Sequence, residues 1–123
     1  MLLRAGLLAL IAIAATASTA MADCRIIAFR FFPPHNDSVS TTGVSTGGSA
    51  CTTRLRSIAT LQMTSSSIVS RPSNGTLSQT GAMGFRYAPR AGFKGVDRYA
   101  IKVCGRGGGG SGCSTLSYNI TVQ

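Results

Sequence analysis

The sequence has no tryptophan and no glutamate, and its 123 residues include one histidine and three acidic residues, all aspartate. A hydrolase needs two carboxylates, or a nucleophile with a base, in one pocket. His35 and Asp37 form the one conceivable acid–base pair, and no nucleophile accompanies them. The sequence therefore predicts a protein that is not an enzyme, and it indicates no cofactor.

Metal-binding motifs are also missing. The four cysteines contain no C-x-x-C pair, and His35 has no neighbouring ligand, which argues against a zinc site or a redox pair. An even number of cysteines in an exported chain is typical of disulfides formed in an oxidising compartment. We therefore expect two disulfides and no metal site.

The N-terminus predicts export. Met1 to Arg4 is a short basic start, Leu7 to Ala15 is apolar, and Ala20-Met21-Ala22 is a small-x-small cleavage site. We interpret residues 1–22 as a signal peptide and residues 23–123 as one domain, in the bacterial periplasm or outside the cell. An uncleaved membrane anchor is the alternative, but the apolar run is shorter than the ~20 residues that cross a bilayer. No later segment has the composition of a transmembrane span.

The chain is strongly basic. Residues 23–123 carry 11 lysines and arginines against three aspartates, a formal net charge of +8. Ten of the 12 cations of the whole chain are arginine, which is suited to bidentate contact with phosphate and carboxylate. An anionic partner and a charge that merely maintains solubility are both compatible with this composition.

Alternating apolar residues predict β-strands in the first half of the domain. Arg25 to Phe32 is expected to form an edge strand that ends at Pro33-Pro34. Residues 36–50, rich in Ser, Thr and Gly, are expected to form a long surface loop with at most a weak strand around Val44. Cys51 to Met63 alternates with period two and predicts a half-buried strand, with a helix over its second part as the alternative. A shorter strand is expected at Ser67 to Arg71.

The second half carries stronger turn signals. Asn74-Gly75 predicts a two-residue hairpin with positive φ at both positions, and Leu77 begins the return strand. A further strand with Phe85 and Tyr87 inward ends at Pro89. Beyond it, Gly92 and Gly95 bracket Phe93 in a tight loop, where Phe93 is expected to plug the end of a sandwich. Asp97 follows as an expected acceptor of backbone N–H groups.

The last two strands predict a disulfide pairing. An antiparallel register that pairs outward Cys104 with outward Cys113 also pairs Ile101 with Leu116 and Tyr99 with Tyr118. This favours Cys104–Cys113 across a glycine-rich hairpin (Gly105 to Gly112) and leaves Cys24 with Cys51. An inter-sheet bridge from Cys51 to Cys104 is the alternative, disfavoured by the outward phase of Cys104 and the absence of tryptophan.

Three motifs resemble one family. The motifs are P-x-N-G-T-L at Pro72 to Leu77, G-F-x-Y-x-P at Gly84 to Pro89 and G-F-x-G-x-D-x-Y at Gly92 to Tyr99. Together they resemble the C-terminal half of bacterial Ig-like domains of the cadherin-like tandem-repeat (VCBS-like) type. The resemblance implies an all-β, antiparallel Ig-like sandwich of about seven strands. The matched positions make the fold and supply no active site; they are Asn74, Gly75, Tyr87, Pro89, Gly92, Phe93, Gly95 and Asp97.

The chain departs from this family in two ways. Family members recur in tandem, whereas this chain holds one copy. Calcium-binding repeats cluster acidic residues, and three scattered aspartates cannot supply the six or more oxygens that calcium prefers. Calcium binding is therefore not expected.

These observations predict a non-enzymatic module for adhesion or protein–protein contact at the bacterial cell envelope. The first alternative is binding of a polyanion such as lipopolysaccharide, an acidic glycan or nucleic acid, through outward basic residues. The second is a structural subunit that associates by edge-strand addition. The candidate anion-binding residues are Arg54, Arg56, Arg86, Arg98 and Lys102.

Overall fold

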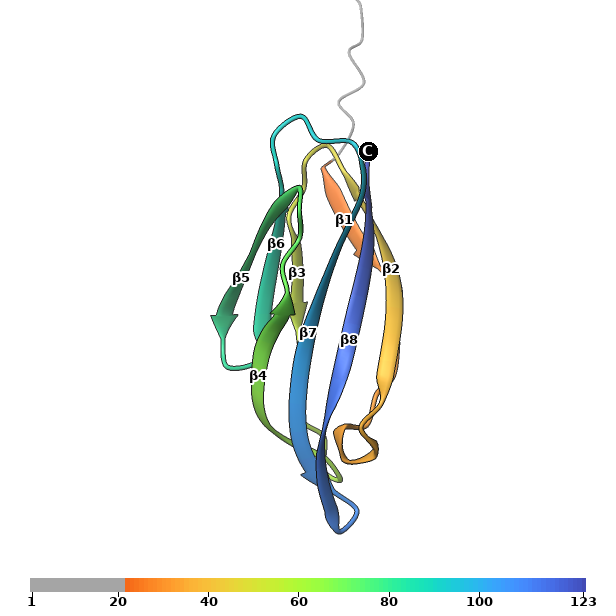
Figure 1. Cartoon of the computed structure of the whole chain (residues 1–123), viewed down its shortest axis with the longest axis vertical. Coiled ribbons are helices and arrows are strands. Elements are labelled where there is room, and N and C mark those ends of the chain that lie inside the picture. The colour runs from red at the N-terminus through yellow and green to blue at the C-terminus, as the bar shows by residue number, and fades with distance from the viewer. Residues whose placement is uncertain (1–21) are drawn as a thin grey trace, which may run out of the picture.

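The computed structural model describes residues 22–123, which form two β-sheets packed face to face (Figure 1). The predicted all-β sandwich with two disulfides is confirmed. The predicted signal peptide, residues 1–22, lies outside the described residues except for Ala22.

The larger sheet has five strands in the order β1-β2-β8-β7-β4, and the smaller has three in the order β3-β6-β5. The eight strands exceed the expected seven by one. In the larger sheet β2 and β8 run parallel, so this sheet is mixed rather than wholly antiparallel. The bounds are β1 (Asp23–Ile26), β2 (Ser38–Thr46), β3 (Cys51–Arg54), β4 (Gln62–Ser70), β5 (Gly75–Gly81), β6 (Gly84–Pro89), β7 (Gly95–Gly107) and β8 (Gly110–Val122), with a short 3-10 helix, η1 (Pro33–His35), before β2.

The core lies between the sheets and is built mainly by alternate residues of the two longest strands. On β7 and β8 the inward side chains are almost fully buried, while their neighbours face outward. The smaller sheet supplies large apolar side chains from β5 and β6. The buried core side chains from these four strands are Leu77, Phe85, Tyr87, Tyr99, Ile101, Val103, Leu116, Tyr118, Ile120 and Val122.

The predicted cysteine pairing is confirmed. Cys104 pairs with Cys113 across β7 and β8, in the register that also pairs Tyr99 with Tyr118. The other disulfide joins Cys24 to Cys51, so the alternative inter-sheet bridge from Cys51 to Cys104 is wrong. The predicted hairpin is present, but its strands continue further than expected and leave a two-residue turn, Gly108-Gly109, with φ of 59° and 80°.

The expected loop at 36–50 is wrong over most of its length, because Ser38–Thr46 forms β2 between β1 and β8. The apolar pattern is misleading here: Thr41, Gly43 and Ser45 face inward, whereas Val44 faces outward. At Gly43 a Cβ atom would lie 2.9 Å from Ile120 Cδ1, so only a glycine fits beneath that side chain without rearrangement. The buried hydroxyl of Thr41 donates to Ile27 O at 2.8 Å.

The long strand expected over Cys51 to Met63 is also wrong. β3 ends at Arg54, and the chain then crosses to the other sheet, where β4 begins at Gln62. The shorter strand expected at Ser67 to Arg71 is the second half of β4. Alternation continues across two strands with an irregular connection between them, and alternation alone does not reveal that break.

The prediction of a hairpin at Asn74-Gly75 is also wrong. β4 and β5 belong to different sheets, and neither Asn74 nor Gly75 has a positive φ. Gly75 is needed for another reason: a Cβ atom there would lie 2.6 Å from Ala88 O and 2.6 Å from the ring of Tyr87. The segment is a crossover between sheets whose amides bind Asp97.

The first strand is shorter than predicted. β1 ends at Ile26, and residues 27–32 lead irregularly to η1. Ile27 is 66% exposed, whereas Phe29 and Phe31 pack partly against the core. The segment that follows β1 therefore presents an aromatic pair to the side of the sandwich instead of extending the ladder.

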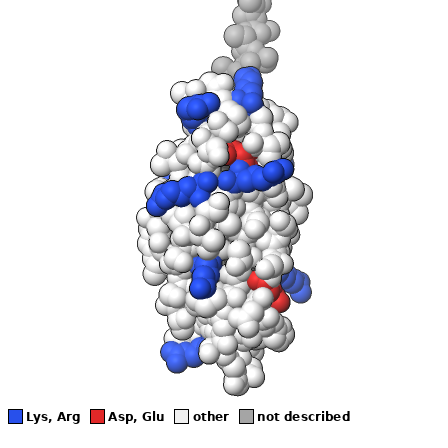
Figure 2. Space-filling model, viewed as in Figure 1, with Lys and Arg blue, Asp and Glu red and all other residues white. Residues whose placement is uncertain are grey.

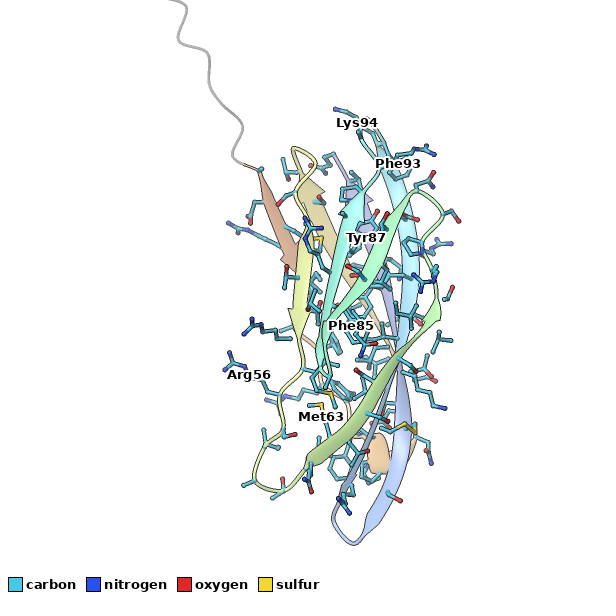
Figure 3. The ribbon with its side chains drawn as sticks, turned by 90° about the vertical axis from the view of Figure 1, so that its left-hand side faces the viewer. Arg56, Met63, Phe85, Tyr87, Phe93 and Lys94 are labelled. Carbon is cyan, nitrogen blue, oxygen red and sulfur yellow. A yellow bond between two sulfur atoms is a disulfide. The ribbon has the colours of Figure 1, made fainter. Side chains whose placement is uncertain are left out.

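The two long sides of the sandwich are closed differently. On one side, Ser66 of β4 donates to Ala82 O, and Gln79 of β5 donates to Ser66 O at 3.2 Å. On the other side β1 lies beside β3 (Figure 3), and the Cys24–Cys51 disulfide joins them. Further along this second side, a pocket opens between the sheets.

Candidate functional site

The predicted basic residues do not form one face. Arg54 and Arg86 lie on the smaller sheet and Arg56 follows β3, whereas Arg98 and Lys102 lie outward on β7 of the larger sheet. In Figure 2 two basic side chains lie end to end across the visible face, and the others are separated by uncharged surface. The five candidates therefore divide into a group of three and a group of two.

The group of three lines a single hollow. In the antiparallel β3–β6 pair Thr52 lies opposite Arg86 and Arg54 opposite Gly84, so Arg54 and Arg86 share the outward face. Arg56 projects from the same region of the chain (Figure 3). We call Arg54, Arg56 and Arg86, together with the hollow that they line, the arginine hollow.

No carboxylate neutralises the arginine hollow within the described part of the chain. The ion pair found in residues 22–123 joins Arg25 to Asp23 at 2.8 Å. Asp37 accepts the amide of Phe32 at 2.8 Å, and Asp97 is buried. Three guanidinium groups near one another with no acidic neighbour create a positive potential that attracts anions.

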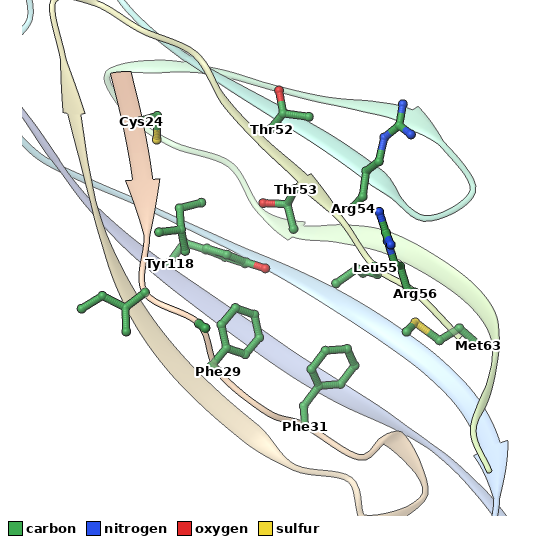
Figure 4. A pocket seen from close by; sticks show the side chains of 13 residues that line it. Cys24, Phe29, Phe31, Thr52, Thr53, Arg54, Leu55, Arg56, Met63 and Tyr118 are labelled. Carbon is green, nitrogen blue, oxygen red and sulfur yellow. The ribbon is translucent and has the colours of Figure 1, made fainter. Parts of the chain in front are cut away.

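A pocket of about 420 Å³ opens beside the arginine hollow, between the segment that follows β1 and the segment that follows β3 (Figure 4). Apolar side chains share its walls with Thr52 and Thr53, and Arg54 and Arg56 stand at its rim. We call it the seam pocket, because it lies along the side that the Cys24–Cys51 disulfide closes. Its lining includes Phe29, Phe31, Arg54, Leu55, Arg56, Met63 and Tyr118.

Tyr118 forms the inner wall of the seam pocket. It is 1% exposed, and its hydroxyl has no hydrogen-bond partner among the described residues. Thr53 lies close by on β3 but does not reach hydrogen-bond geometry (Figure 4). Burial raises the pKa of Tyr118 to about 12, although the nearby Thr53 hydroxyl acts in the opposite direction.

A row of aromatic rings runs from the seam pocket into the core. Phe29 meets Tyr118 edge-on at 5.8 Å, Tyr118 stacks on Tyr99 at 4.8 Å, and Tyr99 stacks on Tyr87 at 5.2 Å. Offset and edge-on aromatic pairs add stability beyond their buried area. The inner wall of the pocket is therefore held rigidly by the core.

The residues taken from the family motifs lie at the opposite end of this row. Asp97 accepts hydrogen bonds from the Tyr87 hydroxyl at 2.7 Å and from the amides of Ser73 and Asn74 at 3.1 Å. Phe93 is partly buried against the core, and the Arg90 guanidinium lies 5.9 Å from its ring centre. Gly92 and Gly95 have φ of 79° and 140°, and Pro89 ends β6. These contacts shape the fold and present no reactive group.

The His35–Asp37 pair is not assembled as a catalytic site. The His35 ring packs edge-on against Phe32 at 4.7 Å, and Asp37 is occupied by the Phe32 amide. Within residues 22–123, no three His, Cys, Asp or Glu side chains are grouped as metal ligands.

None of the helical structure in the described residues is long and apolar enough to cross a membrane. Comparison of the sequence with protein-family models and with curated proteins finds no match. The family resemblance of the motifs therefore stays a prediction.

Sequence reasoning identified the three arginines but not the seam pocket. The available signal was the Phe29/Phe31 pair shortly before Pro33-Pro34. An aromatic pair just outside a short edge strand packs on the side of a sandwich rather than within its sheet.

Proposed function

We propose that this chain is an exported, non-enzymatic Ig-like adhesion module of the bacterial cell envelope, and that its arginine hollow binds phosphate or carboxylate groups of an anionic surface polymer. The observation that carries the proposal is the convergence of Arg54, Arg56 and Arg86 on one hollow without a neighbouring carboxylate. Guanidinium groups bind both anions in a bidentate manner, and the two disulfides suit an oxidising compartment.

The proposal favours a polymer over a small ion. The arginines of the hollow are exposed to solvent, so each contact with an anion is weak and screened by salt. Several such contacts along a polymer add up, and they give a binding strength that falls steeply with salt concentration.

The test is the salt dependence of binding to heparin and to purified lipopolysaccharide. The triple variant R54Q/R56Q/R86Q keeps side-chain size and removes three charges. If all three arginines contact anionic groups, the slope of log affinity against log salt should become shallower by about 2. The matched control R98Q/K102Q/R106Q removes the same charge from β7 and should change the slope much less.

Two results would contradict the proposal. An equal loss of slope in both triple variants would show that net charge alone attracts the polymer. The second contradicting result would be an envelope protein that binds both variants as strongly as it binds the wild-type chain. It would indicate a protein–protein contact on another surface.

A further inference from the structure

We propose that the seam pocket is a second binding site, which takes a small amphiphilic anion with its apolar body between the sheets and its charged end at Arg54 and Arg56. The pocket shares Arg54, Arg56, Thr52 and Leu55 with the arginine hollow, whereas Phe29, Phe31, Met63 and the hydroxyl of Tyr118 line the pocket and not the hollow. The inference goes beyond polymer binding and stands or falls separately.

The walls fit an apolar ligand body. Phe29, Phe31, Leu55 and Met63 pack against the core but are only partly buried. The two phenylalanine rings lie 5.9 Å apart at a tilt of 33° and form one continuous aromatic wall. Met63, opposite, has a flexible thioether chain that adapts to ligands of different shape. A ligand of this kind would complete the burial of all four side chains, which is favourable in water.

The volume fits a small molecule. About 420 Å³ lies within the range of small-molecule sites, and such sites are mostly apolar with a few convergent polar groups. The seam pocket combines an apolar part around Phe29, Phe31 and Met63 with polar groups at its inner wall and its rim (Figure 4).

The inner polar group is the Tyr118 hydroxyl. A buried hydroxyl without a partner is costly, and native proteins rarely leave one in that state. The hydroxyl can both donate and accept a hydrogen bond, but neighbouring atoms cover its oxygen, so a polar atom in the ligand body would satisfy it once an adjacent side chain shifts. This hydroxyl is the observation that distinguishes a ligand site from an ordinary gap between sheets.

The rim supplies the charge. The side chains of Arg54 and Arg56 both line the seam pocket, and in Figure 4 they extend in the same direction, with Arg56 below Arg54. No carboxylate of residues 22–123 pairs with either of them. A carboxylate or sulfonate at the mouth of the pocket would therefore meet two free guanidinium groups while its apolar end stays inside.

The frame of the pocket is held in place before binding. Cys24 lines the pocket and is bonded to Cys51 of β3, so the two strands beside the pocket cannot separate. Tyr118 is fixed by stacking on Tyr99. A preformed site loses little conformational freedom on binding.

The experiment is a calorimetric titration of the purified chain with phenylbutyrate, and with phenylbutanol as its uncharged counterpart. Phenylbutyrate should bind with one-to-one stoichiometry, and phenylbutanol at least about ten-fold more weakly because it lacks the charge. Amide chemical-shift changes should concentrate at residues 26–31, 52–56 and 118. Changes spread over the surface, or equal affinity for the two compounds, would overturn the proposal.

Three variants test the pocket, and two of them, Y118F and R86Q, separate it from the arginine hollow, because Leu55 lines both. L55W fills the pocket and should abolish phenylbutyrate binding. Y118F removes the hydroxyl alone, so for a ligand that hydrogen-bonds to it, such as hydroxyphenylbutyrate, it should weaken binding by about 2- to 12-fold. R86Q lies outside the pocket and should leave phenylbutyrate affinity unchanged while weakening heparin binding.

Folding of each variant is checked by its urea midpoint. Because Y118F removes an unsatisfied buried group, it should fold at least as stably as the wild-type chain. Its affinity for hydroxyphenylbutyrate therefore tests the pocket even if L55W does not fold. Unchanged phenylbutyrate binding in a folded L55W, or equal loss in R86Q and Y118F, would overturn the proposal. A wild-type chain that binds phenylbutyrate but does not bind heparin would count against the polymer proposal alone.

Discussion

The hydroxyl of Tyr87 donates a 2.7 Å hydrogen bond to Oδ2 of Asp97 between the two sheets. The same carboxylate accepts the amides of Ser73 and Asn74 at 3.1 Å, so it joins β6, β7 and the crossover that precedes β5. Both side chains are almost fully buried. One acidic residue therefore fixes the position of the smaller sheet relative to the larger one at this end.

The first prediction is that D97A lowers the free energy of unfolding by about 3–5 kcal/mol, because it leaves buried donors without an acceptor. Y87F removes one of those hydrogen bonds and should cost about 1–2 kcal/mol. Urea unfolding followed by circular dichroism measures both.

D23A is the matched control, since Asp23 pairs with Arg25 at the surface and its loss should change stability by less than about 1 kcal/mol. A loss in D97A no larger than in D23A would contradict a structural role for the buried carboxylate.

The pair also shows what could be predicted from the sequence. Asp97 was predicted to accept backbone amides, and it accepts the amide of the adjacent Arg98 at 3.1 Å. Its other two amide donors lie 23 and 24 residues away, and no local pattern specifies them. The strands β6, β7 and β8 were predicted well because their apolar residues alternate and the two cysteines fix one register.

The errors fall where local pattern and tertiary placement disagree. β2 was expected to be a loop because its inward positions, such as Thr41 and Ser45, are small and polar. Gly75 was interpreted as a turn glycine, whereas it serves close packing against Tyr87. Of the candidate site, the arginines could be named from their outward phase, but their division between two sheets depends on a topology that alternation does not encode.

The second prediction concerns alkaline pH. Burial, together with the nearby Asp97, raises the pKa of Tyr87, and burial raises those of Tyr99 and Tyr118, the last to about 12. In the unfolded chain each tyrosine ionises at about pH 10. The stability contributed by these groups is therefore complete below about pH 10 and is lost as pH rises toward the folded pKa.

Each tyrosine should lower the free energy of unfolding by up to about 1.4 kcal/mol per pH unit above pH 10. Urea unfolding at a series of pH values measures the slope, and tyrosinate absorbance reports ionisation in the folded chain. Y118F should show a shallower decline than the wild-type chain. Ionisation of all three tyrosines near pH 10 without unfolding would contradict this assignment.

The third prediction compares the disulfides. Cys24–Cys51 spans 27 residues and Cys104–Cys113 spans 9. Loop-closure entropy alone gives losses of about 3.6 and about 2.6 kcal/mol for their removal. The difference should be larger in practice, because the hairpin already holds Cys104 opposite Cys113.

The double variants C24A/C51A and C104A/C113A, compared by urea midpoint, test this order. C24A/C51A should also weaken phenylbutyrate binding, because the first disulfide frames the seam pocket, whereas C104A/C113A should not. Equal effects of the two variants on binding would show that the pocket does not depend on its covalent frame.

The last prediction concerns two glycines of β8. A Cβ atom at Gly112 would lie 2.5 Å from Pro33 O and 2.6 Å from Asn36 Oδ1, whereas at Gly110 the nearest atom would be Pro34 Cβ at 4.0 Å. G112A should therefore displace η1, break the 3.1 Å hydrogen bond from the Cys113 amide to Asn36 and cost about 2 kcal/mol. G110A changes the same residue type two positions away and should stay within about 0.5 kcal/mol of the wild-type chain. Urea midpoints and the amide resonance of Cys113 distinguish the two variants. Equal midpoints would mean that η1 does not pack on β8 closely enough to require a glycine there.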